Sequence, residues 1–254
     1  LARIARKVGI RRRVATAHRW FNWLYCNYRV DFSRLRSRAH ESQLNFKLLS
    51  PFKIFWDFDL KEMGSLYGLV PTLQDHRAYL SSSHFNLIIH PKSKGSAREW
   101  HLDNYLELAQ SLPADRYRIF VTGLANEGEA VRREKPALFE LEHVTDMTGK
   151  LSLDELMSFI SQADGLVACS TGVLHLAAAL GKFALGLYSP MRPIHPGRWM
   201  PIGQQAGYLV INKNCSDCRR SKECKCVNEI TPLQVKQRIE MQVEAALSKR
   251  YAES

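Results

Sequence analysis

The sequence lacks any apolar run approaching the roughly 20 residues that a membrane-spanning helix requires. Its arginine-rich amino end is not followed by an apolar core, so the residues present do not predict a signal peptide. It contains neither the G-x-G-x-x-G turn of dinucleotide-binding oxidoreductases nor the lysine-containing P-loop of nucleoside triphosphatases. These absences argue against a membrane-spanning helix, a dinucleotide oxidoreductase and an NTPase.

Cysteine is scarce and concentrated near the carboxyl end. Four of the six cysteines form the pattern C-x2-C-x5-C-x-C, namely Cys215, Cys218, Cys224 and Cys226. Four thiolates can hold a structural zinc ion, although the second pair is closer in sequence than in most zinc sites. Three interpretations stay open, in the order free thiols, zinc and one disulfide. The other two, Cys26 and Cys169, are expected to be ordinary buried residues.

Positive charge is confined to one segment. The chain has 254 residues and a formal net charge of +11, of which residues 1–38 carry +10. The aromatic-rich segment 20–29 lies within this basic region. Such a segment suits an anionic membrane surface, a phosphorylated acceptor or nucleic acid, or it is simply a solvated helix face.

From about residue 85 onward, short apolar runs alternate with helical patterns. Strands are expected over residues 86–90, 117–122, 144–147, 165–169, 184–188 and 207–211, whereas residues 50–80 read as an irregular linker and 123–128 as a loop. Alternating strands and helices predict an α/β fold with a doubly wound parallel sheet. Ligands of such sheets bind beyond the carboxyl ends of the strands.

The turn Ser170-Thr171-Gly172 stands at such a strand end. A helix rich in alanine and leucine is expected to follow and to end at Gly181. Hydroxyl groups, a glycine and unpaired helix N–H groups together predict a phosphate site, with His175 one turn into the helix. Alternatively, Ser170 only caps the helix and His175 is half-buried without a ligand.

Two further strand ends carry polar groups that suit the same ligand. Ser93, Lys94 and Arg98 follow the first strand of this region, and Glu127 follows the second. Cations and N–H groups would hold a diphosphate, and the carboxylate could accept hydrogen bonds from sugar or ribose hydroxyls. The predicted donor-binding set is Ser93, Lys94, Arg98, Glu127, Ser170, Thr171, Gly172 and His175.

Three segments, HPKSKGSAREW, VTGLANEGE and DMTGKLSLDELMSFISQADGLVACSTGVLHLAAALGK, carry a family resemblance. In this order, from about residue 86 to 240, the chain resembles the carboxyl half of glycosyltransferase family 9, the lipopolysaccharide heptosyltransferases. The resemblance implies a GT-B fold with two Rossmann-like domains. Residues 81–254 would form the nucleotide-sugar (donor) domain, and residues 1–80 the carboxyl part of the acceptor domain with a linker.

The resemblance also implies an activity. A heptose-type sugar would pass with inversion from a nucleotide donor, typically ADP-heptose, to a lipopolysaccharide core or related glycolipid, without a metal ion or further cofactor. The protein would be a monomer that touches the anionic inner face of the bacterial inner membrane from the cytoplasm and binds no nucleic acid. Arg98 stands where the family has a lysine, Glu127 matches a donor-contacting acid, and Ser170 replaces a frequent aspartate.

The family's catalytic base is an aspartate in a glycine-containing loop after the first strand of the amino domain. No segment of this sequence matches that loop, so the chain is expected to begin within the amino domain and to be inactive alone. Two alternatives remain: a nucleic-acid-binding protein that uses the basic segment and the cysteines, and a sugar-nucleotide epimerase of similar fold.

Overall fold

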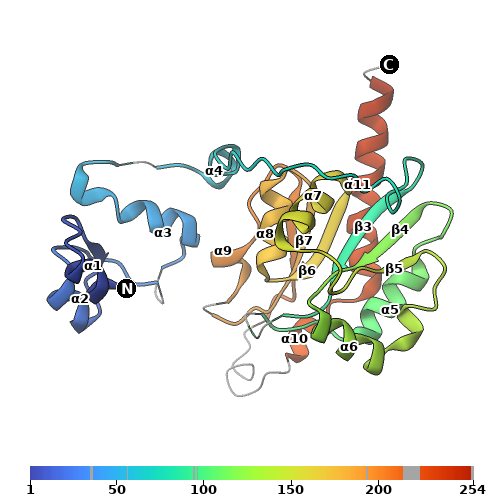
Figure 1. Ribbon diagram of the computed structural model, residues 1–254, viewed down its shortest axis with the longest axis horizontal. Coiled ribbons are helices and arrows are strands. Elements are labelled where there is room, and N and C mark those ends of the chain that lie inside the picture. The colour runs from blue at the N-terminus through green and yellow to red at the C-terminus, as the bar shows by residue number, and fades with distance from the viewer. Residues whose placement is uncertain are drawn as a thin grey trace.

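The computed structural model describes residues 1–34, 37–55, 57–93, 95, 97–192, 194–213 and 224–252. Figure 1 shows a large part built around one parallel sheet and a smaller amino-terminal part at its side. A segment that contains α4 (Leu60–Ser65) runs from the small part to the first strand of the sheet. None of the described helices is long and apolar enough to cross a membrane.

The sheet has six parallel strands and confirms the predicted α/β fold. In chain order they are β3 (Phe85–His90), β4 (Tyr117–Val121), β5 (Val144–Asp146), β6 (Gly165–Cys169), β7 (Phe183–Tyr188) and β8 (Ala206–Val210). Their order across the sheet is β5-β4-β3-β6-β7-β8. β3 and β6 are therefore neighbours, in a register that pairs Leu87 with Gly165 and His90 with Ala168.

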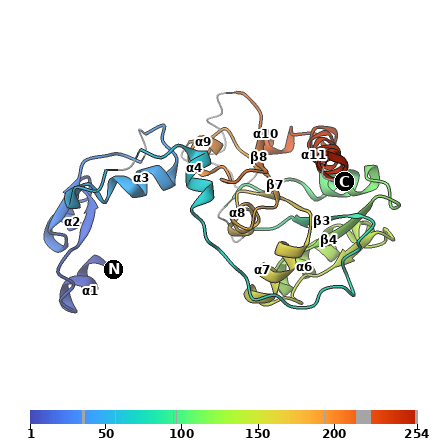
Figure 2. The same ribbon diagram turned by 90° about the horizontal axis from the view of Figure 1, so that it is seen from above.

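Helices cover both faces of the sheet, which explains why its strands are nearly continuous apolar runs. Leu87 and Ile89 point to one face and pack in a core with side chains of α5 (Leu102–Ser111), α6 (Ala125–Glu134) and α11 (Pro232–Ala252). Ile88 points to the other face, against α7 (Leu153–Gln162) and α8 (Gly172–Ala179). Figure 2 shows α7 and α11 on opposite sides of the sheet.

Local capping sets the beginnings of these helices. Before α7, the Ser152 backbone N–H donates to Glu155 Oε2 (2.7 Å), and the Glu155 N–H donates to Ser152 Oγ (3.4 Å). This is the reciprocal capping box that the sequence predicts. After α8, Gly181 adopts φ +74°, a left-handed conformation that glycine reaches without steric cost.

The predicted loop over residues 123–128 is wrong, because α6 already begins at Ala125. Glu127 lies in the first turn of this helix, where its Oε2 accepts a hydrogen bond from the Leu124 backbone N–H (2.8 Å). A carboxylate at this position satisfies an otherwise unpaired helix donor and interacts favourably with the helix dipole.

The amino-terminal part holds a two-stranded parallel sheet, β1 (Val14–Thr16) with β2 (Tyr28–Val30), joined through α2 (Trp20–Tyr25). It also contains α1 (Ala2–Lys7), α3 (Glu41–Lys47) and a short 3-10 turn, η1 (Ser50–Phe52). The sequence did not predict α4, whose six residues include a glycine and begin at a capping box between Asp59 and Glu62.

The two parts meet where α3 begins. His40 Nε2 lies 3.0 Å from the carbonyl oxygen of Met200, just after α9 (Pro196–Trp199). The Glu41 carboxylate lies between two guanidinium groups, 2.6 Å from Arg34 Nε and 2.8 Å from an Arg198 nitrogen. Because the Glu41 and Arg198 side chains are 12% and 15% exposed, this ion pair is shielded from solvent more than a typical surface pair.

His40 is neutral in this arrangement, which leads to a prediction. Its Nδ1 accepts from the Ser42 backbone N–H (3.2 Å), so the proton belongs on Nε2, facing Met200. Burial lowers the pKa of His40 below its ordinary 6.5, and burial together with nearby His40 lowers the pKa of His175. The unfolded chain therefore binds protons that the folded chain does not, and stability is lost as the pH falls through about 6.5.

We expect the unfolding midpoint to fall between about pH 7.5 and about pH 5.5. In the variant His40→Asn the midpoint should depend less on pH, because asparagine also caps a helix but does not titrate. Thermal unfolding followed by circular dichroism at both pH values measures the difference. Equal pH dependence of the two proteins would show that His40 does not contribute to it.

Candidate functional site

A cavity opens where the sheet changes its direction of winding. From β3 the chain passes to α5 on one face, and from the neighbouring β6 it passes to α8 on the other face. The two connections therefore diverge beyond the carboxyl ends of these strands. This divergence creates the crevice in which doubly wound sheets bind ligands.

The cavity has a volume of about 570 Å³, and two kinds of residue line it. We call the polar residues at and after the strand ends the polar wall, namely His90, Ser93, Thr122, Glu127, Thr171 and Gly172. We call the apolar residues the apolar wall, namely Leu124, Met147, Leu151, Leu153, Leu156, Val173 and Leu176.

The start of α8 is the least satisfied part of the polar wall. Thr171 is the N-cap residue but makes no capping hydrogen bond with its side chain. The residue is 7% exposed, and its Oγ1 is buried without a hydrogen-bond partner among the described residues. A Cβ added at Gly172 would meet nothing within 4 Å, so a ligand can approach the backbone there. The first N–H groups of α8 and this hydroxyl offer donors to an anion.

Ser170 is directed elsewhere. It hydrogen-bonds Tyr188 of β7, whose hydroxyl also donates to the Trp199 carbonyl oxygen. This bond opposes the burial that raises the pKa of Tyr188. Ser170 thus neither caps α8 nor lines the cavity, and it connects the turn to the segment around α9.

Glu127 and His90 line the same cavity, Glu127 from α6 and His90 from the end of β3. One Glu127 oxygen holds the Leu124 N–H, as described above, and no hydrogen bond from the described residues reaches the other. His90 Nδ1 lies 3.0 Å from Thr122 Oγ1. Burial lowers the pKa of His90, partly opposed by Glu127 and Glu99, so the imidazole is neutral at neutral pH.

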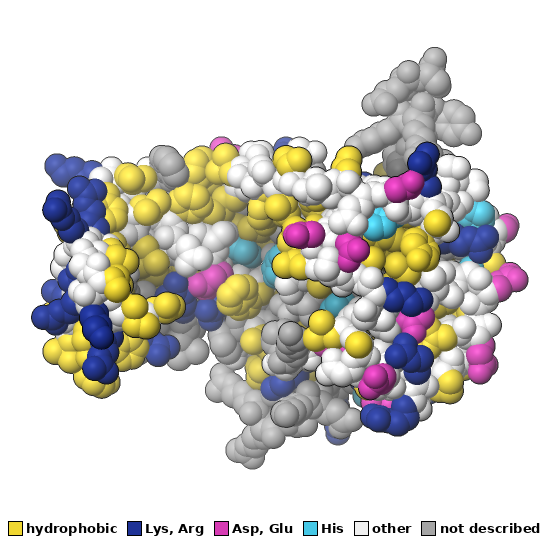
Figure 3. Space-filling view, viewed as in Figure 1, with side chains coloured by type: hydrophobic (Ala, Val, Ile, Leu, Met, Phe, Trp, Pro, Cys, Tyr) yellow, Lys and Arg dark blue, Asp and Glu magenta, His cyan; other side chains and the backbone are white. Residues whose placement is uncertain are grey.

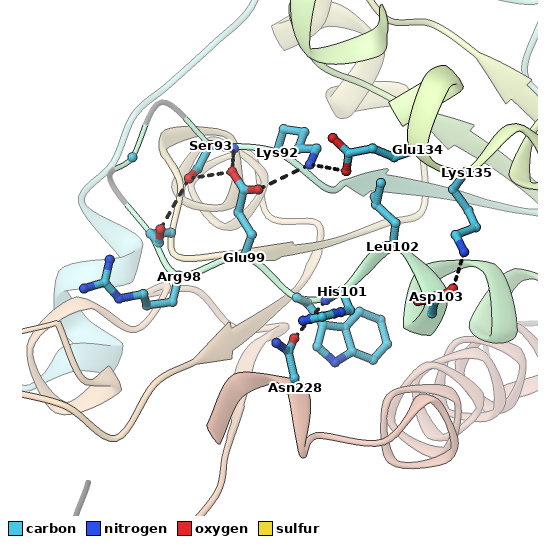
Figure 4. Close-up of a pocket in the computed structure, with 13 residues that line it drawn as sticks. Lys92, Ser93, Arg98, Glu99, His101, Leu102, Asp103, Glu134, Lys135 and Asn228 are labelled. Carbon is cyan, nitrogen blue, oxygen red and sulfur yellow. Dashed lines mark hydrogen bonds and ion pairs between the residues drawn. The ribbon is translucent and has the colours of Figure 1, made fainter. Parts of the chain in front are cut away.

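Arg98 lines an adjacent cavity of about 590 Å³, which shares Ser93 with the first. This second cavity is charged: Lys92 pairs with Glu99 and Glu134, and Lys135 pairs with Asp103. Figure 4 shows Arg98 extending to the other side of the loop from Lys92. Lys94, the remaining predicted cation of this loop, lies outside the described residues.

His175 lies away from both cavities. It is absent from the described lining of each, and its electrostatic neighbour is His40 of the amino-terminal part. Of the predicted set, the structure gathers Ser93, Glu127, Thr171 and Gly172 in one cavity. Arg98 lies next to it, and His175 lies where the two parts of the chain meet.

The cysteine prediction falls partly outside the described residues, which exclude Cys215 and Cys218. Cys224 and Cys226 are buried at the start of α10 (Lys225–Asn228). The described residues contain no group of three or more side chains that could hold a metal ion. Burial raises the pKa of Cys169 to about 12, so this thiol stays protonated.

Sequence reasoning did not select His90, Thr122 or the apolar wall. His90 and Thr122 could have been found, because each stands at the carboxyl end of a strand that the sequence predicted. The leucines of the segment 151–156 gave no such signal, since they also fit the helix that begins there.

A model of glycosyltransferase family 9 (heptosyltransferase) matches residues 2–228, most of the chain and all of the strand ends described above. The chain belongs to glycosyltransferase family 9. This confirms the family resemblance that the three sequence segments carry.

Curated members of the family include similar proteins. A putative glycosyltransferase of Haemophilus influenzae is 29% identical over 218 residues, which cover 82% of this chain and 62% of that protein. Lipopolysaccharide heptosyltransferase 2 of Escherichia coli is 30% identical over 101 residues, 39% of this chain and 29% of that protein. The chain thus spans less than two thirds of the length of these relatives.

Solved structures of family 9 share the fold. The family 9 glycosyltransferase of Veillonella parvula superposes with a TM-score of 0.71 at 14% identity, covering 96% of this chain and 70% of that one. The E. coli heptosyltransferase WaaC with ADP gives a TM-score of 0.55 at 19% identity, covering 89% and 63%. The predicted GT-B fold class is confirmed.

The unpartnered hydroxyl of Thr171 leads to a second prediction. Thr171→Val should leave the unfolding midpoint of the empty protein unchanged or slightly higher, because it removes a buried polar group that has no partner. Affinity for a bound phosphate should fall about tenfold, as expected when one hydrogen bond to a charged group is lost. Differential scanning fluorimetry with and without ADP measures both effects. A clear loss of stability in the empty variant would contradict this description of Thr171.

Gly172 provides the third prediction. Gly172→Ala should leave the empty protein as stable or up to about 1 kcal/mol more stable, because alanine favours helix. The added methyl group would occupy the space through which a ligand reaches the backbone, so ADP should no longer raise the unfolding midpoint. Calorimetric titration with ADP measures the affinity.

A glycine at the other end of α8 supplies the control. Gly181→Ala places alanine at φ +74°, which should destabilise the protein, while any folded protein should bind ADP as before. If Gly172→Ala bound ADP like the unmodified chain, α8 would not be part of the binding site.

Proposed function

We propose that the cavity beside α8 binds a nucleotide sugar. In this proposal the protein takes part in transferring a heptose-type sugar, with inversion, to a lipopolysaccharide core or related glycolipid. The observation that carries the proposal is the buried Thr171 hydroxyl, which has no described partner and lies beside open backbone at the start of α8. A buried polar group without a partner is costly unless a ligand supplies one.

The two walls suit the two halves of a nucleotide. The diphosphate would rest on the first N–H groups of α8 and on Thr171, with Ser93 and Arg98 on its other side. The second oxygen of Glu127 would accept hydrogen bonds from ribose hydroxyls, and the apolar wall would cover the base. Among the similar solved structures, one is the E. coli heptosyltransferase WaaC with ADP and another is the E. coli ADP-heptose heptosyltransferase II, which favours adenine as the base.

The same groups would assist the chemistry. In an inverting transfer, negative charge grows on the nucleoside diphosphate as its bond to the sugar breaks. The α8 N–H groups and the Arg98 guanidinium would stabilise that charge more strongly in the transition state than in the bound donor. Their contribution would therefore be to rate as well as to affinity.

The acceptor side of the proposal rests on the basic segment. Arg3, Arg6, Lys7, Arg11 and Arg12 are exposed at the amino end, and Figure 3 shows Lys and Arg side chains gathered at the amino-terminal end of the molecule. Exposed Trp20 and Trp23 lie nearby on α2. We propose that this surface meets phosphate groups, on the acceptor or on an anionic membrane surface.

A thermal-shift comparison of ADP-, GDP-, UDP- and CDP-sugars tests the donor proposal. ADP-sugars should raise the unfolding midpoint most, by an amount equivalent to about 2.7 kcal/mol when the ligand is at one hundred times its dissociation constant. Glu127→Gln should reduce the shift, because a neutral amide is a weaker acceptor for the ribose hydroxyls.

An opposite result would favour the nucleic-acid alternative. If no nucleotide sugar shifted the midpoint, and the protein instead bound generic DNA or RNA with strong salt dependence, the basic segment would be a nucleic-acid surface. Donor binding with no affinity for DNA would leave the glycosyltransferase proposal standing.

A further inference from the structure

In the loop after β3, the carboxylate of Glu99 is held by three donors of the protein itself. Glu99 Oε1 accepts hydrogen bonds from the Ser93 backbone N–H (2.7 Å) and from Ser93 Oγ (3.2 Å). Glu99 Oε2 lies 3.5 Å from Lys92 Nζ. Figure 4 shows the Glu99 carboxylate directed to Ser93 on one side and to Lys92 on the other.

These three donors are the kind that proteins use to bind phosphate. A backbone N–H, a hydroxyl and an ammonium group directed at one point form an anion-binding concavity. In this structure the Glu99 carboxylate fills it. Ser93 also lines the cavity at which α8 begins, so an anionic ligand bound there would accept hydrogen bonds from the same Ser93 donors.

A bound diphosphate and the Glu99 carboxylate would repel each other. Two negative charges within about 4–6 Å of each other in a partly buried site interact unfavourably, and each weakens the other's hydrogen bonds to a shared donor. The charge of Glu99 acts on His90, which lines the cavity. Burial lowers the pKa of His90, and Glu127 and Glu99 partly oppose this effect. The competition therefore acts at the polar wall.

We propose that Glu99 acts as an internal competitor of the donor diphosphate for Ser93 and Lys92. In the empty state Glu99 satisfies these groups and keeps them in place. When the diphosphate binds, Ser93 and Lys92 exchange the Glu99 carboxylate for phosphate oxygens, and part of the affinity is lost in displacing it. This inference rests on the proposed function, since it assumes a diphosphate in the cavity beside α8.

Glu99 would thereby favour release of the product as well. A nucleoside diphosphate that has lost its sugar must leave before the next donor enters, and a carboxylate that returns to Ser93 competes with it. Among the described groups of this loop, Glu99 alone touches both Ser93 and Lys92. Asp103 and Glu134 belong to the same charged cavity but have no described contact with Ser93.

The variant Glu99→Gln separates charge from shape. Glutamine Oε1 can still accept from the Ser93 N–H and hydroxyl, so the loop stays in place, but the negative charge is gone. We expect ADP and inorganic pyrophosphate to bind Glu99→Gln about five to ten times more tightly than the unmodified chain. Adenosine, which has no phosphate, should bind both proteins equally. Isothermal titration calorimetry measures the three affinities.

Asp103→Asn is the matched control. It removes one negative charge from the same cavity without touching Ser93 or Lys92, because Asp103 pairs with Lys135. Its affinity for ADP should stay within about twofold of the unmodified chain, as expected of a charge partly screened by solvent. An equal gain in Asp103→Asn and Glu99→Gln would overturn the proposal, since net charge alone would then explain it.

The remaining outcomes distinguish this inference from the proposed function. If the unmodified chain binds ADP and Glu99→Gln binds it equally or more weakly, Glu99 only supports the loop, and the donor site stands without the competition. If pyrophosphate binds Glu99→Gln more tightly but no nucleotide sugar binds either protein, the competition stands and the donor proposal fails. If neither protein binds any phosphate ligand, both fail.

Discussion

The directions in which the chain leaves two neighbouring strands determine where this protein can bind a ligand. β3 and β6 lie side by side, but their following helices cover opposite faces of the sheet. The strand ends between them are therefore not covered by either connection. The polar groups of the candidate site stand at or after the carboxyl ends of β3, of β6 and of β4 beside β3, so the place of the site follows from the topology.

Within that crevice, hydrogen-bonding groups fall into two classes. Some are already satisfied by the protein, as Ser93 is by Glu99 and the Leu124 N–H is by Glu127. Thr171 is not satisfied within the described chain. Satisfied groups hold the walls in place, whereas an unsatisfied group gains most when a ligand arrives. This division is compatible with the proposal that a cavity which is already folded binds an anion.

The sequence predicted the sheet well and the site in part, for physical reasons. The strands could be predicted because a parallel sheet covered on both faces needs continuous apolar runs, and Ser152 with Glu155 marks a helix beginning by purely local chemistry. The helix α4 was not predicted, because six residues that include a glycine show little helical periodicity. The sequence also misplaced the start of α6. The residues from Gly123 to Gly128 have the composition of a loop, and the bond from the Leu124 N–H to Glu127 that begins the helix was not anticipated.

Other features depend on contacts between distant residues. His175 lies within electrostatic reach of His40, which is 135 positions earlier in the chain, and no local pattern contains that information. The apolar wall needs the segment after β5 to fold back over the strand ends. The contact of Glu99 with Ser93 spans only six residues, but it depends on the shape of a loop and not on a helical or strand period.

One further contact connects the site to a remote part of the sequence. The Trp100 indole N–H donates to the carbonyl oxygen of Ile230 (2.8 Å), and the His101 backbone N–H donates to Asn228 Oδ1 (2.8 Å). The segment that carries Arg98 and Glu99 is thus fastened by residues that precede α11, more than 120 positions later. A protein shortened before residue 228 would contain the residues of all six strands, but it would lose this anchor together with α11, which packs against one face of the sheet. The residues that form the sheet and the residues that hold the loop after β3 in place therefore lie in separate parts of the sequence.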